Sequence, residues 1–482
     1  MSNSIQQFNE FGIKKIEKLS EIYQEDPTKI AEYIEGITSV VVEFGLSLIA
    51  EEWNSFDDIL HEKKKVRPDW QVVRTDEATL GTSLGQVRYH KTLFKNKITG
   101  ERKYLLDDLL GIEPHARMTE DAEARILAET VESSYKKGGS SASISDFEVS
   151  KQTVMNKLRV LRFPTLPKTD EKRKTSILYI DADEDHVSLQ YLNKKGDIPD
   201  SRSNTYMPKI AYVYEGTERD GETHRLVNVR YFGGGYDGSK GVEMFWKEIY
   251  DYIEDAYDPE VLEKIYISGD GAEWIAKGAG LHAKASFVLD KFHLHKYIVG
   301  ATSHLLDSKE EVRSEIWHAI YGKQKKDITG IFDQILAVTD AESRRNAVEN
   351  SEKYILSHWT AIMRGVDHRE DGIHCSAEGH VSHIYADRMS SRPMGWSKKG
   401  ADQMARLRIY YFNGGNMLEL VRYQKEELPL AAGCEEMSAA VINESINRNK
   451  RNMGKIAELP SYSIPYPQIR KIAAIRNLIW GL

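Results

Sequence analysis

Acidic residues appear in two segments that otherwise have the composition of buried β-strands. Asp183 lies within 176–191, and Asp270 follows the apolar run 264–268. Both segments are dense in β-branched, aromatic and aliphatic residues and are bounded by turn residues, which predicts strands. Burying an unpaired carboxylate costs several kcal/mol, so an acid in such a strand usually has a cation beside it. We therefore expect these acids to hold divalent metal, as phosphodiester chemistry on DNA requires.

The residues alone leave the role of each acid open. Asp181, Asp183 and Asp185 alternate along one strand, so they point to the same face, and any of them could be a ligand or part of a solvated strand end. Asp270 precedes Gly271, which lets the backbone turn sharply beside a ligand. Its alternative role is to cap a helix after the strand.

The order of the predicted elements indicates how the acids are positioned. Strands are predicted at 176–191, 208–216, 225–232, 262–268 and 283–289, and helices at 242–257, at 273–277 and from 291 onward. Three strands that can pair as a meander, followed by alternating helices and strands, is the order of the ribonuclease H-like fold. A doubly wound sheet would alternate strand and helix from the start. We expect a catalytic domain at 175–300 and 371–425, interrupted by a helical insertion at 301–370.

The chain before residue 175 is predicted to be rich in helices. Residues 1–68 have helical periodicity, and 69–116 has short strands separated by turns. Residues 117–174 contain three short predicted helices, at 122–135, 141–147 and 150–161, and then a linker. This pattern is typical of a helix-turn-helix whose third helix would present Lys157 and Arg159 to DNA, although small helical domains that do not bind DNA share it. The remaining residues, 426–482, are predicted to be a basic, irregular tail.

Composition sets outer limits on function. The chain has 482 residues, 29% of them charged and 40% apolar, as in an ordinary globular protein. No run approaches the ~18 consecutive apolar residues of a membrane span, which predicts no membrane partner. Cys375 and Cys434 are the two cysteines, and this number fits a reducing cytoplasm. The net charge of −8 means that DNA binding would depend on local basic patches.

Two further clusters carry chemistry. His374, Cys375, His380 and His383 include zinc-ligand types, but a structural zinc site normally pairs its cysteines, and His380 could equally contact DNA or cap local structure. Downstream, basic residues are interleaved with Met389, Met394, Trp396 and Tyr410, which suits phosphate binding and stacking of Trp396 on a base, although a solvated helix face has the same composition. The residues of this basic segment are Arg388, Arg392, Trp396, Lys398, Lys399 and Arg406.

The chain resembles DDE-type transposases of bacterial insertion sequences, specifically the ISLre type, which is related to the Mutator-like superfamily. The resemblance covers most of the chain, and its pieces occur in order at 104–111, 178–187, 267–275, 289–293, 375–380 and 391–401. It favours Asp183, Asp270 and Glu378 as the catalytic metal ligands, with Asp181 as the alternative first acid. His293 and His380 are candidate accessory residues.

The resemblance implies an α/β ribonuclease H-like catalytic domain interrupted by an all-α insertion and preceded by an α-rich DNA-binding region. It further implies cleavage of the element's 3′ ends and their joining to target DNA, with two Mg²⁺ or Mn²⁺ ions. The implied partners are double-stranded DNA, as terminal inverted repeats and target, and a second copy of the chain in a homodimer. The implied location is the bacterial cytoplasm, at the nucleoid.

Two other functions compete with this expectation. A ribonuclease H-like nuclease or resolvase would cut DNA without joining it. A non-catalytic DNA-binding derivative of a transposase would do neither, and the presence of all three candidate acids argues against it.

Overall fold

The computed structural model describes residues 3–165, 171–191, 204–221, 223–392, 394–425 and 434–456. The chain divides into two compact units. Unit 1 comprises Met1–Ile126, Ser140–Val149 and Glu426–Leu482, and unit 2 comprises Leu127–Gly139 and Ser150–Lys425.

Unit 1 combines long helices with one small antiparallel sheet, in the order β1-β2-β3. Its elements are α1 (Asn3–Gln7), η1 (Phe8–Gly12), α2 (Ile13–Glu25), α3 (Ile30–Glu62), η2 (Lys64–Val66), β1 (Trp70–Gly81), β2 (Gln86–Asn96), β3 (Arg102–Tyr104), α4 (Leu105–Leu109), the first part of α5 (Glu120–Glu132), and α19 (Cys434–Ile456). The helices predicted over 1–68 and short strands within 69–116 are therefore present, but the third strand ends at Tyr104, where helix α4 begins instead of further strand. In contrast, the tail predicted to be irregular is helical over 434–456, and its prolines lie outside the described residues.

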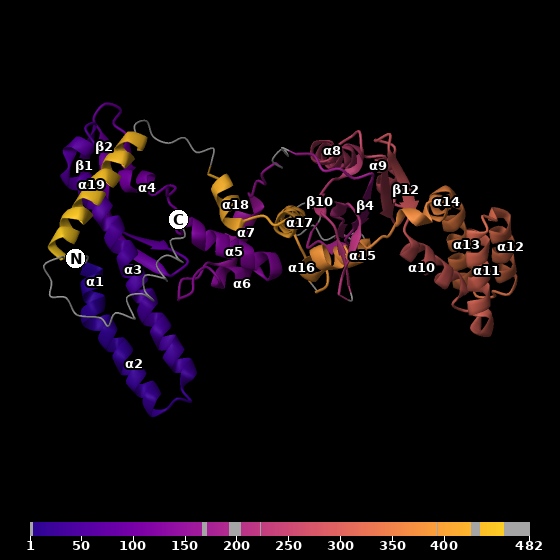
Figure 1. Cartoon of the computed structure of the whole chain (residues 1–482), viewed down its shortest axis with the longest axis horizontal. Coiled ribbons are helices and arrows are strands. Elements are labelled where there is room, and N and C mark those ends of the chain that lie inside the picture. Colours follow the sequence, from indigo (N-terminus) through magenta and orange to yellow (C-terminus); the bar gives the residue numbers. More distant parts are fainter. Residues whose placement is uncertain are drawn as a thin grey trace. The chain divides into compact units, whose positions relative to one another are not determined.

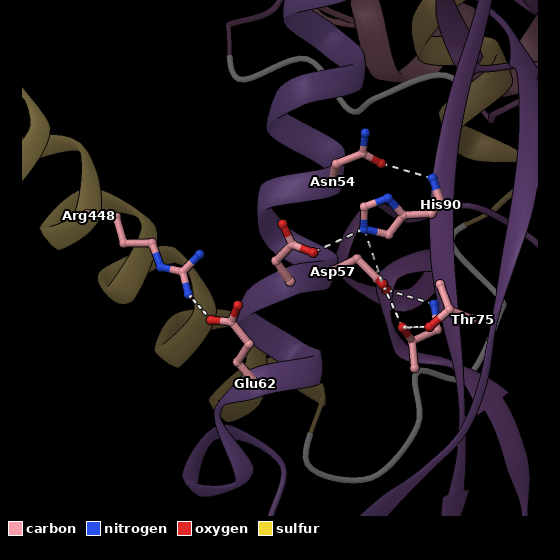
Figure 2. Close-up of polar contacts among 8 residues, drawn as sticks. Asn54, Asp57, Glu62, Thr75, His90 and Arg448 are labelled. Carbon is pink, nitrogen blue, oxygen red and sulfur yellow. Dashed lines mark hydrogen bonds and ion pairs between the residues drawn. The ribbon is translucent and has the colours of Figure 1, made fainter. Parts of the chain in front are cut away.

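A buried carboxylate fixes α3 to the sheet of unit 1. Asp57, 1% exposed, accepts hydrogen bonds from the backbone N–H of Thr92 at 2.9 Å and from its hydroxyl at 2.7 Å. Figure 2 shows Asp57 together with the ion pair between Glu62 and Arg448, which joins α3 to α19 at 2.6 Å. A buried acid is tolerated here because backbone and side-chain donors replace water.

Helix α3 is the described helix that is long and apolar enough to cross a membrane by length and composition. Its most apolar 18-residue window has a mean hydropathy of 1.5, and 11% of that window is buried. This corrects the expectation that no such stretch exists, which arose because Glu43 and several small polar residues interrupt the apolar run. The helix packs against β2, α2 and α19.

The prediction of a helix at 141–147 is wrong. The chain there forms turns, because the small polar side chains bond to nearby backbone instead of supporting a helix. The hydroxyl of Ser143 pairs with both backbone groups of Phe147, and that of Ser145 donates to the carbonyl of Leu84. The first and third helices expected for 117–162 are present, as α5 (Glu120–Glu132) and α7 (Lys151–Arg159), while the helix between them is α6 (Tyr135–Ser140) and not 141–147.

Unit 2 is built on a mixed five-stranded sheet with the order β10-β7-β4-β11-β12. Strand β7 is antiparallel to both β10 and β4, whereas β4, β11 and β12 are parallel. Its strands are β4 (Ile177–Glu184), β5 (Val187–Ser188), β6 (Thr205–Tyr206), β7 (Lys209–Tyr214), β8 (Thr217–Asp220), β9 (Thr223–Leu226), β10 (Arg230–Gly234), β11 (Lys264–Gly269) and β12 (Ala285–Leu289).

Helices account for the rest of unit 2. They are the end of α5, α6 (Tyr135–Ser140), α7 (Lys151–Arg159), α8 (Gly238–Ala256), α9 (Glu273–Ala279), α10 (Lys291–Thr302), η3 (Leu306–Ser308), α11 (Lys309–Tyr321), α12 (Lys325–Ala337), α13 (Glu342–Ser357), α14 (Trp359–Asp367), η4 (Arg369–Asp371), α15 (Ala377–Val381), η5 (Ser382–Ala386), α16 (Asp387–Met389), α17 (Lys398–Phe412) and α18 (Met417–Tyr423). Residues 301–370 are helical, as expected for an insertion.

The strand predicted at 225–232 is two strands. Asn228 has a φ of +52°, a left-handed conformation that interrupts the extended backbone between β9 and β10. Strand β9 pairs with β8 in a separate hairpin, and β10 alone joins the main sheet. The segment 176–191 likewise splits, because β4 ends at Glu184 and β5 pairs with β6.

The two faces of the main sheet differ in chemistry because side chains alternate along each strand. One face presents Leu178, Ile180 and Ile267 to a large apolar core that includes Phe245 and Trp246 of α8. The other face carries the tyrosines and acids of the same strands, and Figure 1 shows α15 on the side of β4 opposite α8. The candidate acids thus belong to the face that the core does not cover.

A carboxylate pocket at the strand ends of unit 2

Three acids from separate parts of unit 2 line one pocket of about 860 Å³. Asp183 lies near the end of β4, Asp270 directly follows β11, and Glu378 is in α15. Because β4 and β11 are parallel neighbours, their carboxyl ends meet at one edge of the sheet. His293 of α10 also lines the pocket. The pocket therefore brings together all three predicted ligands and one of the two predicted accessory histidines.

The turn after β11 is built to hold Asp270. Gly271 has a φ of +93°, and a Cβ there would lie 2.5 Å from the imidazole of His358. One oxygen of Asp270 accepts from the backbone N–H of Ala272 at 2.9 Å. The hydroxyl of Tyr354, in α13, donates to the carbonyl of Asp270 at 2.6 Å. Helices of the 301–370 segment thus clamp the loop that presents the second acid.

The pocket is strongly acidic. Five carboxylates line it, belonging to Asp183, Glu184, Asp185, Asp270 and Glu378. Burial, together with the charges of Asp270 and Glu378, raises the pKa of Asp183 to about 7, while a backbone hydrogen bond and His293 oppose the rise. Neighbouring carboxylates oppose one another's ionisation, so a bound cation would stabilise the carboxylate form.

A histidine already lies between two acids at this site. Nδ1 of His293 is 2.9 Å from Asp290, and Nε2 is 3.3 Å from Oε1 of Glu378. The hydrogen bond to Asp290 raises the pKa of His293 above its usual 6.5, with further help from nearby carboxylates. Asp290 also caps α10 by accepting from the backbone N–H of Phe292. The imidazole is consequently held in place at the pocket wall.

The donor set suits a hard divalent cation, because carboxylate oxygens are the ligands that Mg²⁺ and Mn²⁺ prefer. Within the ranges that the structure describes, however, no three His, Cys, Asp or Glu side chains are already arranged as a set of metal ligands. Glu378 has a side chain that is 50% exposed and pairs with His293. The chemistry of the donors fits the expected metal, while their arrangement is not that of a closed coordination sphere.

Asp181 lies outside the pocket, although it shares a face of β4 with Asp183. It is 0% exposed and accepts hydrogen bonds from the hydroxyl of Tyr212 at 2.7 Å and the backbone N–H of Ser376 at 2.9 Å. Its burial raises its pKa to about 7.

Arg388 and Trp396 do not present surfaces to DNA, which corrects their predicted role. Each is 6% exposed. The guanidinium of Arg388 lies 4.9 Å above the ring of Trp396 and donates to the carbonyl of Thr130, while the indole N–H of Trp396 donates to Met389. Burial lowers the pKa of Arg388 to about 10. This pair packs inside unit 2, although the basic segment was expected to contact DNA.

The other predicted DNA contacts divide into paired and exposed groups. Arg406 pairs with Asp402 at 3.1 Å. Arg159 donates to the hydroxyl of Ser397, and Lys157 is half-buried. Arg392, Lys398 and Lys399 are exposed, and Lys398 pairs with Asp237. The surface left for phosphate contact is therefore smaller than the sequence indicated.

The histidine and cysteine cluster is spread over different surroundings. His380 meets the hydroxyl of Tyr231 at 3.0 Å, and burial lowers its pKa to about 4. His383 is exposed beside Asp387, and burial raises the pKa of the Cys375 thiol. Among the residues described, His380 does not line the carboxylate pocket.

Sequence reasoning missed residues that the helical segment contributes to the pocket. Lys296 and Tyr297 of α10 line it together with Asn350 of α13. The signal for Lys296 was its place one turn after His293, which puts both side chains on one face of the helix. Asn350 carried no such signal, because its approach depends on how α13 packs against α10.

Unit 2 is thus an α/β domain with a carboxylate-lined pocket at the ends of two neighbouring parallel strands. The chain belongs to UPF0236, an uncharacterised protein family that matches residues 24–427. The relative named UPF0236 protein TTE0610/TTE0881/TTE1053/TTE2432, from Caldanaerobacter subterraneus subsp. tengcongensis, is 36% identical over 422 residues, which cover 87% of this chain and 85% of the relative. UPF0236 protein TTE2489 of the same organism is also 36% identical, with coverage of 87% and 86%.

A further relative from that organism, 35% identical over 87% of this chain and 85% of its own length, has a name that joins eleven designations. Among solved structures, the Drosophila P element transposase strand transfer complex is similar over 70% of this chain and 87% of that chain. The identity is 12% and the TM-score is 0.21, which is too low to argue a shared fold.

Proposed function

We propose that this chain is a DNA transposase of the DDE type, in the ISLre group related to the Mutator-like superfamily. It would cleave the 3′ ends of its own element and join them to target DNA in the bacterial cytoplasm. The observation that carries the proposal is the convergence of Asp183, Asp270 and Glu378 on one pocket from two parallel strands and a helix that follows a helical insertion.

The proposal includes a ribonuclease H-like fold for the catalytic domain. The sheet order β10-β7-β4-β11-β12, with β7 antiparallel to its neighbours, supports this assignment. In that arrangement the first strand is central and its acid lies next to the acid of the fourth strand. The helices at 309–367 enter the domain between its second and third acids.

Asp183, Asp270 and Glu378 would hold the divalent metal. Two divalent ions held there would supply activation of the attacking oxygen and stabilisation of the charge on the phosphorus. Glu378 would complete the ligand set by turning from His293 toward the other two acids, and its 50% exposed side chain has room to do so. The carboxylates themselves exclude a phosphate from the pocket until a cation neutralises them.

Lys296 would bind the phosphate of the DNA strand beside the one that is cut. Among the described residues that line the pocket it is the one lysine or arginine, against five carboxylates. It is exposed, so its ammonium can reach a ligand without a desolvation cost. Arg392, Lys398 and Lys399 are exposed and would contribute further phosphate contacts.

The names of the relatives fit a mobile element. One name joins eleven designations and another joins four, as expected for a sequence that occurs in several copies in a genome.

The proposal extends to a homodimer formed through α3. Ile30, Ile34 and Val41 are 54%, 59% and 52% exposed, and their spacing places them on one face of the helix. An exposed apolar stripe of this kind is stabilised when a second copy covers it.

A second candidate function is a nuclease that uses the same pocket but never joins strands. The pocket chemistry is common to both functions, so the distinction requires an assay of products. The protein is incubated with Mg²⁺, an unlabelled target plasmid and labelled DNA that carries the sequences on either side of its gene. A transposase should give both nicked and joined products. Nicked product without joined product would replace the proposal with the nuclease.

A further inference from the structure

Four tyrosines cover the sheet face that carries the acids. They are Tyr179 of β4, Tyr212 and Tyr214 of β7, and Tyr266 of β11. The rings of Tyr179 and Tyr214 stack at 5.3 Å, and those of Tyr179 and Tyr266 at 6.3 Å. We call these residues the tyrosine layer.

The hydroxyls of the tyrosine layer all bond to one segment, 371–376, which returns from the helical insertion toward Glu378. Tyr179 donates to the carbonyl of Asp371, and Tyr266 donates to its side chain at 2.5 Å. Tyr214 donates to the carbonyl of His374 at 2.7 Å. We call 371–376 the return segment, because it brings the chain back to the sheet.

Asp181 completes this set of anchors. Its Oδ2 accepts from the backbone N–H of Ser376 at 2.9 Å and from the hydroxyl of Tyr212 at 2.7 Å, and Tyr212 in turn meets the hydroxyl of Ser376 at 2.9 Å. Tyr214 adds a weaker contact at 3.3 Å. Asp181 and Tyr212 lie directly opposite each other in the β4–β7 register. The carboxylate is fully buried, and these donors replace its hydration.

Ser376 is where the helix that carries Glu378 begins. Its carbonyl accepts from the backbone N–H of His380 at 3.2 Å, and Glu378 follows two residues after it. Each residue turns an α-helix by about 100°, so a shift of one residue at Ser376 would rotate Glu378 away from the pocket. The bond from Ser376 to Asp181 therefore sets the rotation of the third acid.

We propose that Asp181 is a positioning residue, which together with the tyrosine layer fixes the return segment so that Glu378 faces the pocket. Two of the acids of β4 then have different tasks: Asp183 faces the pocket, and Asp181 holds the chain that supplies Glu378. The inference rests on the proposed function for its consequence in catalysis, but the anchoring itself can be measured without metal.

The test compares Asp181→Ala with Asp181→Asn in the full chain. Asn retains an oxygen that can accept from Ser376, whereas Ala leaves that buried N–H without its partner. Hydrogen exchange without metal should be at least tenfold faster over 372–380 in Asp181→Ala and within threefold of wild type in Asp181→Asn. Asp57→Ala is the matched control, because it removes a buried carboxylate that also accepts from a backbone N–H and a hydroxyl, but in unit 1.

A second readout uses Fe²⁺ with ascorbate and peroxide, which cleaves backbone close to a bound metal. Wild type should be cut near 183, 270 and 378. Asp181→Ala should keep the first two cuts and lose most of the third, and Asp181→Asn should restore it. Loss of all three cuts in Asp181→Asn would make Asp181 a metal ligand and overturn the positioning role.

The remaining outcomes separate the two claims. Unchanged exchange over 372–380 in Asp181→Ala overturns the anchoring, whatever the metal does. If exchange is faster in Asp181→Ala but Fe²⁺ never cuts the wild-type protein, the anchoring holds and the metal site of the proposed function is overturned. The catalytic purpose of the anchor is then overturned as well. Tyr212→Phe, which removes one hydroxyl, tests the same anchor if Asp181→Ala does not fold. Tyr212→Phe should raise exchange over 372–380 by a smaller factor than Asp181→Ala. An exchange rate in Tyr212→Phe equal to that of wild type would overturn the anchoring.

Discussion

The imidazole Nε2 of His293 lies 3.3 Å from Oε1 of Glu378, while its Nδ1 lies 2.9 Å from Asp290. The histidine therefore links a helix cap to the most exposed of the three candidate ligands. Protonated, it is a cation inside an acidic pocket, next to the carboxylate that must turn for metal to be held by all three acids.

Replacing His293 with Gln should lower the rate of metal-dependent nicking about 10- to 100-fold, the range expected for loss of a charged hydrogen bond worth ~1.5–3 kcal/mol. Single-turnover nicking of a labelled end measures this directly. His318→Gln is the control, because His318 is exposed in α11. A nicking rate for His293→Gln equal to that of wild type would show that His293 has no role in the reaction.

Replacing Lys296 with Met should weaken DNA binding rather than the chemical step. Loss of a phosphate contact to an ammonium should raise KM about tenfold and leave kcat within a factor of about three. Steady-state nicking at several DNA concentrations separates the two constants. Lys326→Met, an exposed lysine in α12, should behave as wild type. An equal loss of kcat and kcat/KM would show that Lys296 acts in the transition state instead.

The parts of the site that could be predicted from sequence are those where a single strand or turn carries the signal. Asp183 was recognisable because an acid interrupts a buried strand, and Asp270 because Gly271 follows it. The order of the strands followed from their spacing along the chain. Glu378 had no comparable local signal, because the tyrosine layer, Asp181 and the return segment place it, and those contacts join residues 105 to 195 positions apart.

The errors have a common physical origin. Arg388 and Trp396 were expected on the surface because basic residues are interleaved there with methionines and aromatic residues, yet Arg388 is buried against the ring of Trp396 and donates to the carbonyl of the distant Thr130. The predicted helix at 141–147 failed because Ser143 and Ser145 bond to the backbone. Asn228 divided a predicted strand through a left-handed conformation that its residue type permits without requiring.

Asp57 should make the stability of unit 1 depend on pH. Burial raises the pKa of Asp57 above its usual 3.8, although hydrogen bonds from Thr92 oppose the rise. The unfolded carboxyl therefore ionises first as pH rises, so the contribution of Asp57 to folding is complete below its unfolded pKa and is lost as pH passes the folded pKa.

Asp57→Asn cannot ionise, so its free energy of unfolding should improve relative to wild type as pH rises from about 3.5 toward neutrality. Denaturant titrations at several pH values measure the difference. Asp69→Asn, an exposed acid of the same unit, should show a flat difference. A difference for Asp57→Asn that is flat or that falls with pH would contradict the buried, raised state of this carboxyl.

The exposed stripe of α3 predicts the oligomeric state. Ile34→Glu should convert a wild-type dimer to monomer at micromolar concentration, because a charge cannot be buried against a second apolar stripe. Sedimentation velocity measures the mass. Ile98→Glu is the control, since Ile98 is 80% exposed in a turn of the same unit. A monomeric wild type would show that this interface does not form. A dimer that survives Ile34→Glu would show that the interface lies elsewhere.

The central claim, that the three acids form a metal site for DNA strand cleavage and joining, is tested most directly by Asp270→Asn. The change keeps the size of the side chain but loses the charge that would hold the cation. Wild type and the exposed control Asp333→Asn should nick and join labelled flanking DNA only with Mg²⁺ or Mn²⁺, and Asp270→Asn should bind the same DNA while its rate falls at least 1,000-fold, about 4 kcal/mol. Activity of Asp270→Asn equal to wild type would contradict the account.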